Sequence, residues 1–511
     1  MVDLDAAFVR YERIVSDTYK RIDALIQNGD VKPLLLWRAL LPMVLPICAL
    51  LIPCHKGGWL WRPVLQAVAL SLSVDIILHQ RALLGGNGYM VGLIMVWWSV
   101  WSSTLLFFND TERDFRRIER VPSTSSRDSG KQNGSATKVD HRLVGKRHSE
   151  SFLWVSYPSS LKHRLGWTLA LVLNMRGPDF SFRISSLDPL PPQLDIKPKP
   201  VNERRARACP QAATRIRVAF VRFFVSYLVL DILKTIMIWD PYFLGSISTL
   251  PPPPLDRLCI VPDFIRAYRS VVSGTGVYFA LLFVTALNPI VFLGLSTAFP
   301  NASRALTATP LDAPWLYADQ FGPISAILDD GLAGAWGKWW HQIFRFGFVS
   351  TGKWVISFLP ASLSSNRNIR RIITMLVAFT ISGLIHGFGS YTQLGEENCP
   401  SGPFLFFALQ AVGIFVQDIW CRLVVNSLFS HGVSLPPWFR RLGNVAFVLG
   451  WLFFSGTHIA DDFATGGMWL TEPLPFSPIR GLLGQGWLIW KTPWLEHYDD
   501  GTYWGSGVRV L

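Results

Sequence analysis

The sequence contains few charged residues and few cysteines. Of its 511 residues, 16% are Asp, Glu, Lys or Arg and six are Cys, none of them in a CxxC pair. Scattered cysteines argue against a zinc or redox site, and ten histidines without a clustered pair do not supply the ligands of a di-iron hydroxylase. A serine-hydrolase elbow and a phosphate-cradling glycine loop are also missing. We therefore expect no bound metal and no bound cofactor.

Hydrophobic residues make up 50% of the chain, and 22 residues are Trp. This composition indicates a polytopic membrane protein. We predict an all-α bundle of about eight transmembrane helices, because runs of roughly 18 to 24 apolar residues can cross about 30 Å of hydrocarbon. Two shorter apolar segments, 165–175 and 343–360, suit re-entrant or interfacial placement as well as spanning, so the count ranges from eight to ten. The eight runs lie near 36–54, 63–80, 88–108, 216–239, 276–299, 372–390, 402–425 and 444–460.

Four regions follow from this pattern. Residues 1–30 predict an amphipathic helix that Gly29 can end, with an apolar face that packs on the bundle or lies among the lipid headgroups. The first three spans occupy 31–108. Residues 109–215 read as a basic, partly disordered cytosolic loop with room for a re-entrant segment, and 123–151 is its disordered part. Residues 216–511 form the expected catalytic membrane core. The helical face at 1–30 comprises Phe8, Tyr11, Val15, Tyr19, Ile22 and Ile26.

The net charge of +13 comes largely from the loops expected in the cytosol. Anionic lipid headgroups or a phosphorylated ligand explain this charge, and nucleic acid is not needed as a partner. The same topology puts His341 at the cytosolic mouth of the bundle and His386 inside the membrane. It puts Cys259 and Cys399 on the lumenal side, where a disulfide is permitted but not indicated.

Two histidines, 45 residues apart, are the strongest functional signal. His386 lies deep in the apolar run 372–389, where an imidazole costs several kcal/mol of lost hydration. A neutral imidazole has the basicity needed to take a proton from an alcohol that attacks a thioester. His341 or Gln342 can supply the hydrogen-bond donor that orients the thioester or stabilises the oxyanion. For an alcohol that attacks a thioester, His386 is therefore the candidate base.

The second histidine ends a dense aromatic cluster, Trp336-Gly337-Lys338-Trp339-Trp340-His341-Gln342. Trp336, Trp339 and Trp340 can pack on an acyl chain or a pantetheine arm, although isolated tryptophans are more often an ordinary interfacial belt. The cluster resembles the tryptophan-histidine signature of the wax synthase-like branch of membrane-bound O-acyltransferases. Ser382-Gly383-Leu384-Ile385-His386 resembles the intramembrane histidine motif of that family. The stretches 174–178 (NMRGP) and 239–243 (WDPYF) are similar to two further segments of fungal members that modify secondary metabolites.

The resemblance implies transfer of an acyl group, usually acetyl from acetyl-CoA, to a hydroxyl of a hydrophobic acceptor such as a polyketide or terpenoid. It assigns the role of base to His386 and the partner position to His341. Ala335 and Lys338 depart from the usual family residues Phe and Arg. Residency in the endoplasmic reticulum is expected. The expected substrate or acyl-CoA contacts are Trp336, Lys338, Trp339, Trp340, Gln342, Arg345, Ser382 and Arg176, with Lys338, Arg345 and Arg176 near phosphate or simply snorkelling to the headgroups.

Three alternatives remain open. His458 begins an HxxxD pattern that some soluble acyltransferases use, although here it ends a membrane span, where the carboxylates are expected at the interface. A long-chain acyl-CoA could replace acetyl-CoA and give a wax-type ester. A proton-coupled transporter could use His386 without catalysis.

Overall fold

The computed structural model describes residues 4–121, 151–194, 209–253, 255–258, 262–395, 399–422 and 436–511. They fall into two compact units. The first comprises 1–110, 220–287 and 319–511, and the second comprises 111–219 and 288–318. Almost all of the predicted disordered stretch 123–151, together with Cys259, lies outside the described residues.

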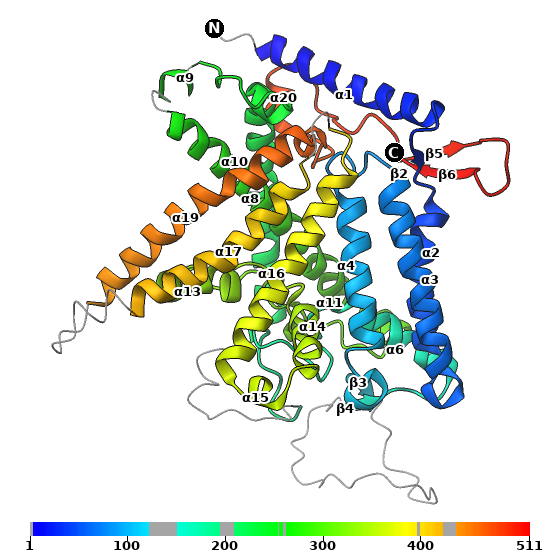
Figure 1. Cartoon of the computed structure of the whole chain (residues 1–511). Coiled ribbons are helices and arrows are strands. Elements are labelled where there is room, and N and C mark those ends of the chain that lie inside the picture. Colours follow the sequence, from blue (N-terminus) through cyan, green and yellow to red (C-terminus); the bar gives the residue numbers. More distant parts are fainter. Residues whose placement is uncertain are drawn as a thin grey trace, which may run out of the picture. The chain divides into compact units, whose positions relative to one another are not determined.

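Each of the eight apolar runs forms a helix, which confirms a helical membrane protein (Figure 1). Among the described helices, six are long and apolar enough to cross a membrane: α3, α4, the continuous helix 262–298, α16, α17 and α19. α2 has 16 residues, about 24 Å at 1.5 Å per residue, and α8 carries five charged residues. The count of eight therefore stays a prediction. The helices are α2 (Leu36–Leu51), α3 (Gly58–His79), α4 (Tyr89–Leu106), α8 (Ala212–Trp239), α10 (Pro262–Asn288) continuing through η3 (Pro289–Leu293) into α11 (Gly294–Ala298), α16 (Arg367–Thr392), α17 (Ser401–Trp420) and α19 (Pro437–Thr465).

The two ambiguous apolar segments form short helices. α6 (Leu161–Leu173) and α14 (Arg345–Ser357) each have 13 residues. At 1.5 Å per residue such a helix reaches about 20 Å, which is less than the hydrocarbon thickness. Their lengths favour re-entrant or interfacial placement. The other short elements are η1 (Cys54–Lys56), η2 (Pro241–Leu244), α9 (Leu255–Leu258), α13 (Ser325–Gly334), η5 (Ala335–Trp339), α15 (Ala361–Ser364), η7 (Met468–Leu470) and α20 (Pro478–Leu482).

The N-terminal segment forms α1 (Leu4–Gln27), as its periodicity predicts. Phe8, Tyr11 and Ile22 on its apolar face are buried, and Gly29 follows the helix with a φ of 79° that a side chain would strain. In Figure 1, α1 runs across one end of the bundle, near α20 and the C-terminus. The helix therefore packs against other elements of the first unit.

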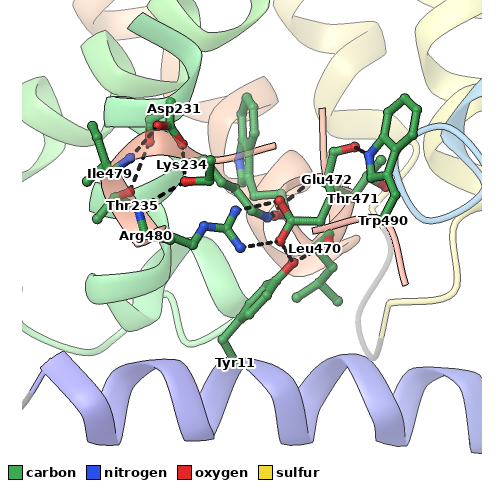
Figure 2. A network of polar contacts seen from close by, with 12 residues as sticks. Tyr11, Asp231, Lys234, Thr235, Leu470, Thr471, Glu472, Ile479, Arg480 and Trp490 are labelled. Atoms are coloured by element: carbon green, nitrogen blue, oxygen red, sulfur yellow. Dashed lines mark hydrogen bonds and ion pairs between the residues drawn. The ribbon is translucent and has the colours of Figure 1, made fainter. Parts of the chain in front are cut away.

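A buried polar network attaches α1 to the C-terminal segment (Figure 2). The Tyr11 hydroxyl donates to Glu472 over 2.6 Å, and Arg480 donates two bonds to the same carboxylate, at 2.9 and 2.6 Å. Burial alone would raise the pKa of Glu472, but the positive charge of Lys234 and the bonds from Arg480 and Tyr11 hold it below its usual value. Asp231 of α8 accepts bonds from Ser477 and from the backbone N–H of Ile479.

The second unit shows that much of 109–215 is ordered structure. It includes α5 (Thr111–Asp114) and α12 (Pro300–Leu306), with η4 (Pro314–Tyr317). β3 (Arg116–Val121) pairs antiparallel with β4 (Ser151–Ser156), and Ile118 of β3 packs with Trp315. The sequence did not predict this sheet, because its two strands come from either side of the polar stretch. Two further two-stranded sheets lie in the first unit: parallel β1 (Lys32–Pro33) with β2 (Gln80–Arg81), and antiparallel β5 (Leu495–Tyr498) with β6 (Gly507–Val510).

Candidate active site

His386 lies on α16, which packs beside α4 and α17 in the first unit (Figure 1). Its Nδ1 is 2.6 Å from the hydroxyl of Tyr89, the first residue of α4. Its ring stacks on Phe407 of α17, with centroids 4.6 Å apart and planes inclined by 18°. A hydrogen bond on one nitrogen and a ring on one face together fix the orientation of the imidazole.

His341 follows η5 and lies in an aromatic environment. Its ring centroid is 5.3 Å from that of Trp340 and 5.5 Å from that of Phe344. His341 and His386 are close enough to interact electrostatically. The fold therefore brings together the two histidines that the sequence singled out. Successive ring contacts also connect them, from His386 through Phe407, Trp336 and Trp340 to His341.

The three tryptophans of the cluster have different surroundings. Trp336 packs among Phe379, Phe406 and Phe407, and its indole N–H donates to the side-chain oxygen of Gln410 over 3.3 Å. Because these partners are core residues of α16 and α17, Trp336 is not part of an interfacial belt. Trp339 stacks on Tyr278 with centroids 5.8 Å apart. Trp340 lies between Trp336 and His341 and is half-buried.

The side chains of Gln342 and Arg345 stabilise the loop 340–344, which contains His341. The Gln342 amide N–H₂ donates to the carbonyls of Trp336 and Trp340, at 3.2 and 2.6 Å. Its oxygen accepts a 2.6 Å bond from Arg345, which also donates to the Gly337 carbonyl. With its amide hydrogens directed to the main chain, Gln342 holds the loop in shape. Its expected oxyanion contact therefore depends on a rearrangement of this loop.

The remaining candidate contacts are dispersed. Lys338 is exposed and pairs with Asp330 at 2.5 Å. Ser382 lies four residues before His386 and therefore on the same face of α16. Arg176 belongs to the second unit, where it is buried and donates to the carbonyl of Ala318 over 3.0 Å. Among the described residues, no group of three or more His, Cys, Asp or Glu side chains could hold a metal ion.

Residues 317–409, which include both histidines, match the family model described as the membrane bound O-acyl transferase family. Over this segment the chain is similar to the membrane bound O-acyl transferase family. It is 24% identical over 331 residues to a protein named O-mevalon transferase in Penicillium terrestre, an alignment that covers 62% of this chain and 66% of the relative. It is 32% identical over 203 residues to an O-mevalon transferase of Aspergillus niger, covering 37% and 42% of the two chains. An acetyltransferase of Hericium erinaceus is 26% identical over 358 residues, covering 69% and 78%.

The alignments thus span at most about two thirds of the two mevalon transferases. No solved structure matches the chain. These relatives are named as transferases of fungi, and the match to the O-acyl transferase family covers the part of this chain that contains both histidines.

Outside the segment that matches the O-acyl transferase family, the stretch 239–243 is structural. The Asp240 carboxylate is fully buried and accepts two bonds from Arg269 of α10, at 3.3 and 3.1 Å. It also accepts the backbone N–H of Tyr242, whose hydroxyl donates to Asp461 of α19 over 2.7 Å. This stretch therefore joins α8, α10 and α19. In the second unit, Gly177 of the 174–178 stretch adopts a φ of 59° beneath the ring of Phe182.

The HxxxD pattern lies within α19, and its two carboxylates differ in burial. Asp462 is 3% exposed and accepts a bond from the Ser390 hydroxyl of α16. Asp461 is exposed and holds Tyr242. Asp462 is covered by α16, and the placement of the two carboxylates at the interface stays a prediction. These bonds give the two carboxylates roles in helix packing.

Sequence reasoning missed Tyr89, Phe407 and Gln410. For Tyr89 and Gln410 the sequence offered one signal, a polar side-chain group within an apolar run. Gln410 is fully buried. Gln410 holds Trp336 on one side and donates to Ser455 of α19 on the other, at 3.0 Å. Phe407 gave no signal, because one phenylalanine in a run of apolar residues does not stand out.

Proposed function

We propose that the chain is a membrane-bound O-acyltransferase that transfers an acyl group, acetyl in the first instance, from a CoA thioester to a hydroxyl of a hydrophobic secondary metabolite. One observation supports this most directly: His341 and His386, far apart in sequence, interact within the segment that matches the O-acyl transferase family. A pair of imidazoles lined by aromatic rings is suited to an oily alcohol and a thioester, since it supplies a base without a metal.

In the proposed reaction, Nε2 of His386 accepts the proton of the acceptor hydroxyl as its oxygen attacks the thioester carbonyl carbon. The new C–O bond forms, a tetrahedral oxyanion develops, and His341 donates a hydrogen bond to it. When the C–S bond breaks, the electron pair leaves with the CoA sulfur. The proton held at Nε2 passes to that thiolate, so CoA is released as a thiol and the imidazole returns to its neutral form.

The donor and acceptor are proposed from chemistry and from the names of the relatives. Acyl-CoA is a co-substrate, so no bound cofactor is required. The names include both acetyl and mevalon transfer, so a larger acyl group competes with acetyl as the donor. A long-chain acyl-CoA that would give a wax-type ester is a further alternative. The acceptor would reach the site from the bilayer, and the proposed location is the endoplasmic reticulum.

The test uses the full chain purified into lipid nanodiscs. Acetyl-CoA, mevalonyl-CoA and palmitoyl-CoA are each supplied with a lipid extract from a host strain that lacks this chain. Free CoA is measured with a thiol reagent, and the new ester is identified by mass spectrometry. We expect acceptor-dependent CoA release. The acyl-CoA that supports it identifies the donor, and the ester identifies the acceptor.

His386→Ala and His341→Ala serve as the catalytic variants, and His163→Ala, in the second unit, is the matched control. We expect the first to abolish ester formation, the second to reduce it strongly, and the control to behave as wild type. Turnover by His386→Ala would disprove the assignment of the base. Proton uptake coupled to solute movement without any CoA release would instead support the transporter alternative.

A further inference from the structure

We infer that Tyr89 is a positioning residue for His386: its hydroxyl oxygen accepts the Nδ1–H of the imidazole and thereby leaves the Nε2 lone pair free. This inference depends on the proposed function, because it matters only if Nε2 removes the acceptor proton. A neutral imidazole carries one N–H, so the partner of one nitrogen decides whether the other can act as a base.

The contact is well defined. The Tyr89 hydroxyl lies 2.6 Å from Nδ1, and Tyr89 itself is 2% exposed. Its ring packs edge-on against Phe463 of α19, with centroids 5.3 Å apart, and also covers Gly389 of α16. Three helices therefore hold the phenol in place, and rotation of the His386 ring would break its bond to Tyr89.

The direction of the bond follows from the role proposed for Nε2. The neutral ring carries one proton, so an Nε2 that acts as a base requires this proton on Nδ1. The atom 2.6 Å from Nδ1 is the Tyr89 hydroxyl oxygen. In this tautomer that oxygen accepts from Nδ1–H.

The same arrangement aids the proton transfer. When Nε2 takes the proton of the alcohol, the imidazole becomes a cation that carries N–H groups on both nitrogens. The Nδ1–H bond to Tyr89 strengthens as this charge develops, so the interaction is worth more in the transition state than in the ground state. His341 is a titratable group that ring contacts link to His386 through Phe407, Trp336 and Trp340, and Tyr89 is not part of this series of ring contacts.

The test compares Tyr89→Phe with Tyr242→Phe in the full chain in nanodiscs. Both substitutions remove one hydrogen-bonded hydroxyl from a buried tyrosine, and only the first touches His386. The substrates are acetyl-CoA and whichever of 1-decanol, farnesol or cholesterol the wild type esterifies fastest. We expect Tyr89→Phe to lower kcat by about 10- to 100-fold, with KM for both substrates within about twofold of wild type. Tyr242→Phe should keep kcat.

Melting temperatures of both variants separate a structural effect from positioning. A kcat loss in Tyr89→Phe that exceeds that of Tyr242→Phe at a comparable melting temperature supports the inference. An unchanged kcat, or equal losses in the two variants, overturns it. If the wild type turns over and His386→Ala does not, while Tyr89→Phe is fully active, the inference fails and the proposed function stands. If the wild type transfers no acyl group to any acceptor, both fail.

Discussion

The ring of Tyr89 lies directly against the backbone of Gly389. A Cβ added at Gly389 would come within 2.9 Å of the hydroxyl end of that ring, closer than side-chain carbons normally approach. Because Gly389 and His386 share α16, this contact helps to set the distance between α4 and the proposed base, together with Gly92 of α4, which lies against the Phe388 carbonyl. Glycine at a helix contact allows this close approach, as is common where membrane helices meet.

Gly389→Ala should lower activity, because the new methyl group pushes the Tyr89 ring away from Nδ1 of His386. We expect a fall in kcat of about tenfold or more, measured as CoA release. Gly450→Ala is the control, since a Cβ at that position on α19 meets nothing within 4 Å. Equal activities of the two variants would contradict a role for this contact.

Asp240→Asn should destabilise the first unit strongly. The substitution leaves the buried Arg269 guanidinium without its carboxylate, and breaking a buried ion pair costs about 3 to 5 kcal/mol. Asp329→Asn breaks the exposed pair with Arg441 and should cost less than about 1 kcal/mol. Thermal unfolding in one detergent compares the two. Similar melting temperatures would show that Asp240 does not hold α8 to α10.

The polar network that joins Tyr11 of α1 to Glu472 and Arg480 should stabilise the fold less at acid pH. The pKa of Glu472 in the folded protein lies below its ordinary value of 4.5, so the unfolded chain takes up the proton first as the pH falls. This contribution to stability is complete above pH 4.5 and is lost as the pH falls through the lower, folded value. The wild type should therefore lose melting temperature between pH 5 and pH 3.

Glu472→Gln tests this pH dependence. The variant should melt lower than wild type at pH 7, because Arg480 loses its carboxylate, and it should show a smaller further loss in acid. Glu496→Gln, which removes an exposed partner of Arg509, is the control. If Glu472→Gln and wild type lose the same melting temperature between pH 5 and pH 3, Glu472 is not responsible for the acid sensitivity.

Lys338→Gln tests the expected phosphate contact. Lys338 and Asp330 are both exposed, so their ion pair is weak and the ammonium group can exchange to a CoA phosphate. We expect KM for acetyl-CoA to rise several-fold while kcat stays unchanged. Lys353→Gln, on the exposed surface of α14, should leave both constants unchanged. A wild-type KM in Lys338→Gln would assign this lysine to the Asp330 pair alone.

His458→Ala separates the two histidine motifs. The carboxylates of the HxxxD pattern are held by Ser390 and Tyr242, so we expect the variant to retain most of its acyl transfer. Loss of turnover at normal expression would move the proposed base from α16 to α19.

Much of the helical architecture could be predicted from the sequence. A backbone that crosses lipid must form long helices with apolar side chains, and such helices give the sequence long apolar runs. The apolar face of α1 was also readable, since its period of three to four residues identifies the buried side and Gly29 the end. The pairing of His341 with His386 came from motif resemblance. Periodicity alone does not show that two residues 45 positions apart lie in the same site.

Tertiary packing decided the rest. The Tyr89 hydroxyl reaches His386 across 297 positions of sequence, and Asp462 is buried only because α16 covers it. The β3–β4 sheet forms between strands on either side of a polar stretch that gave no strand signal. Local sequence determines which segments form helices and which of their faces are apolar. It does not determine which polar group on one helix meets which on another, because that depends on helix crossings set by the packing of the whole unit.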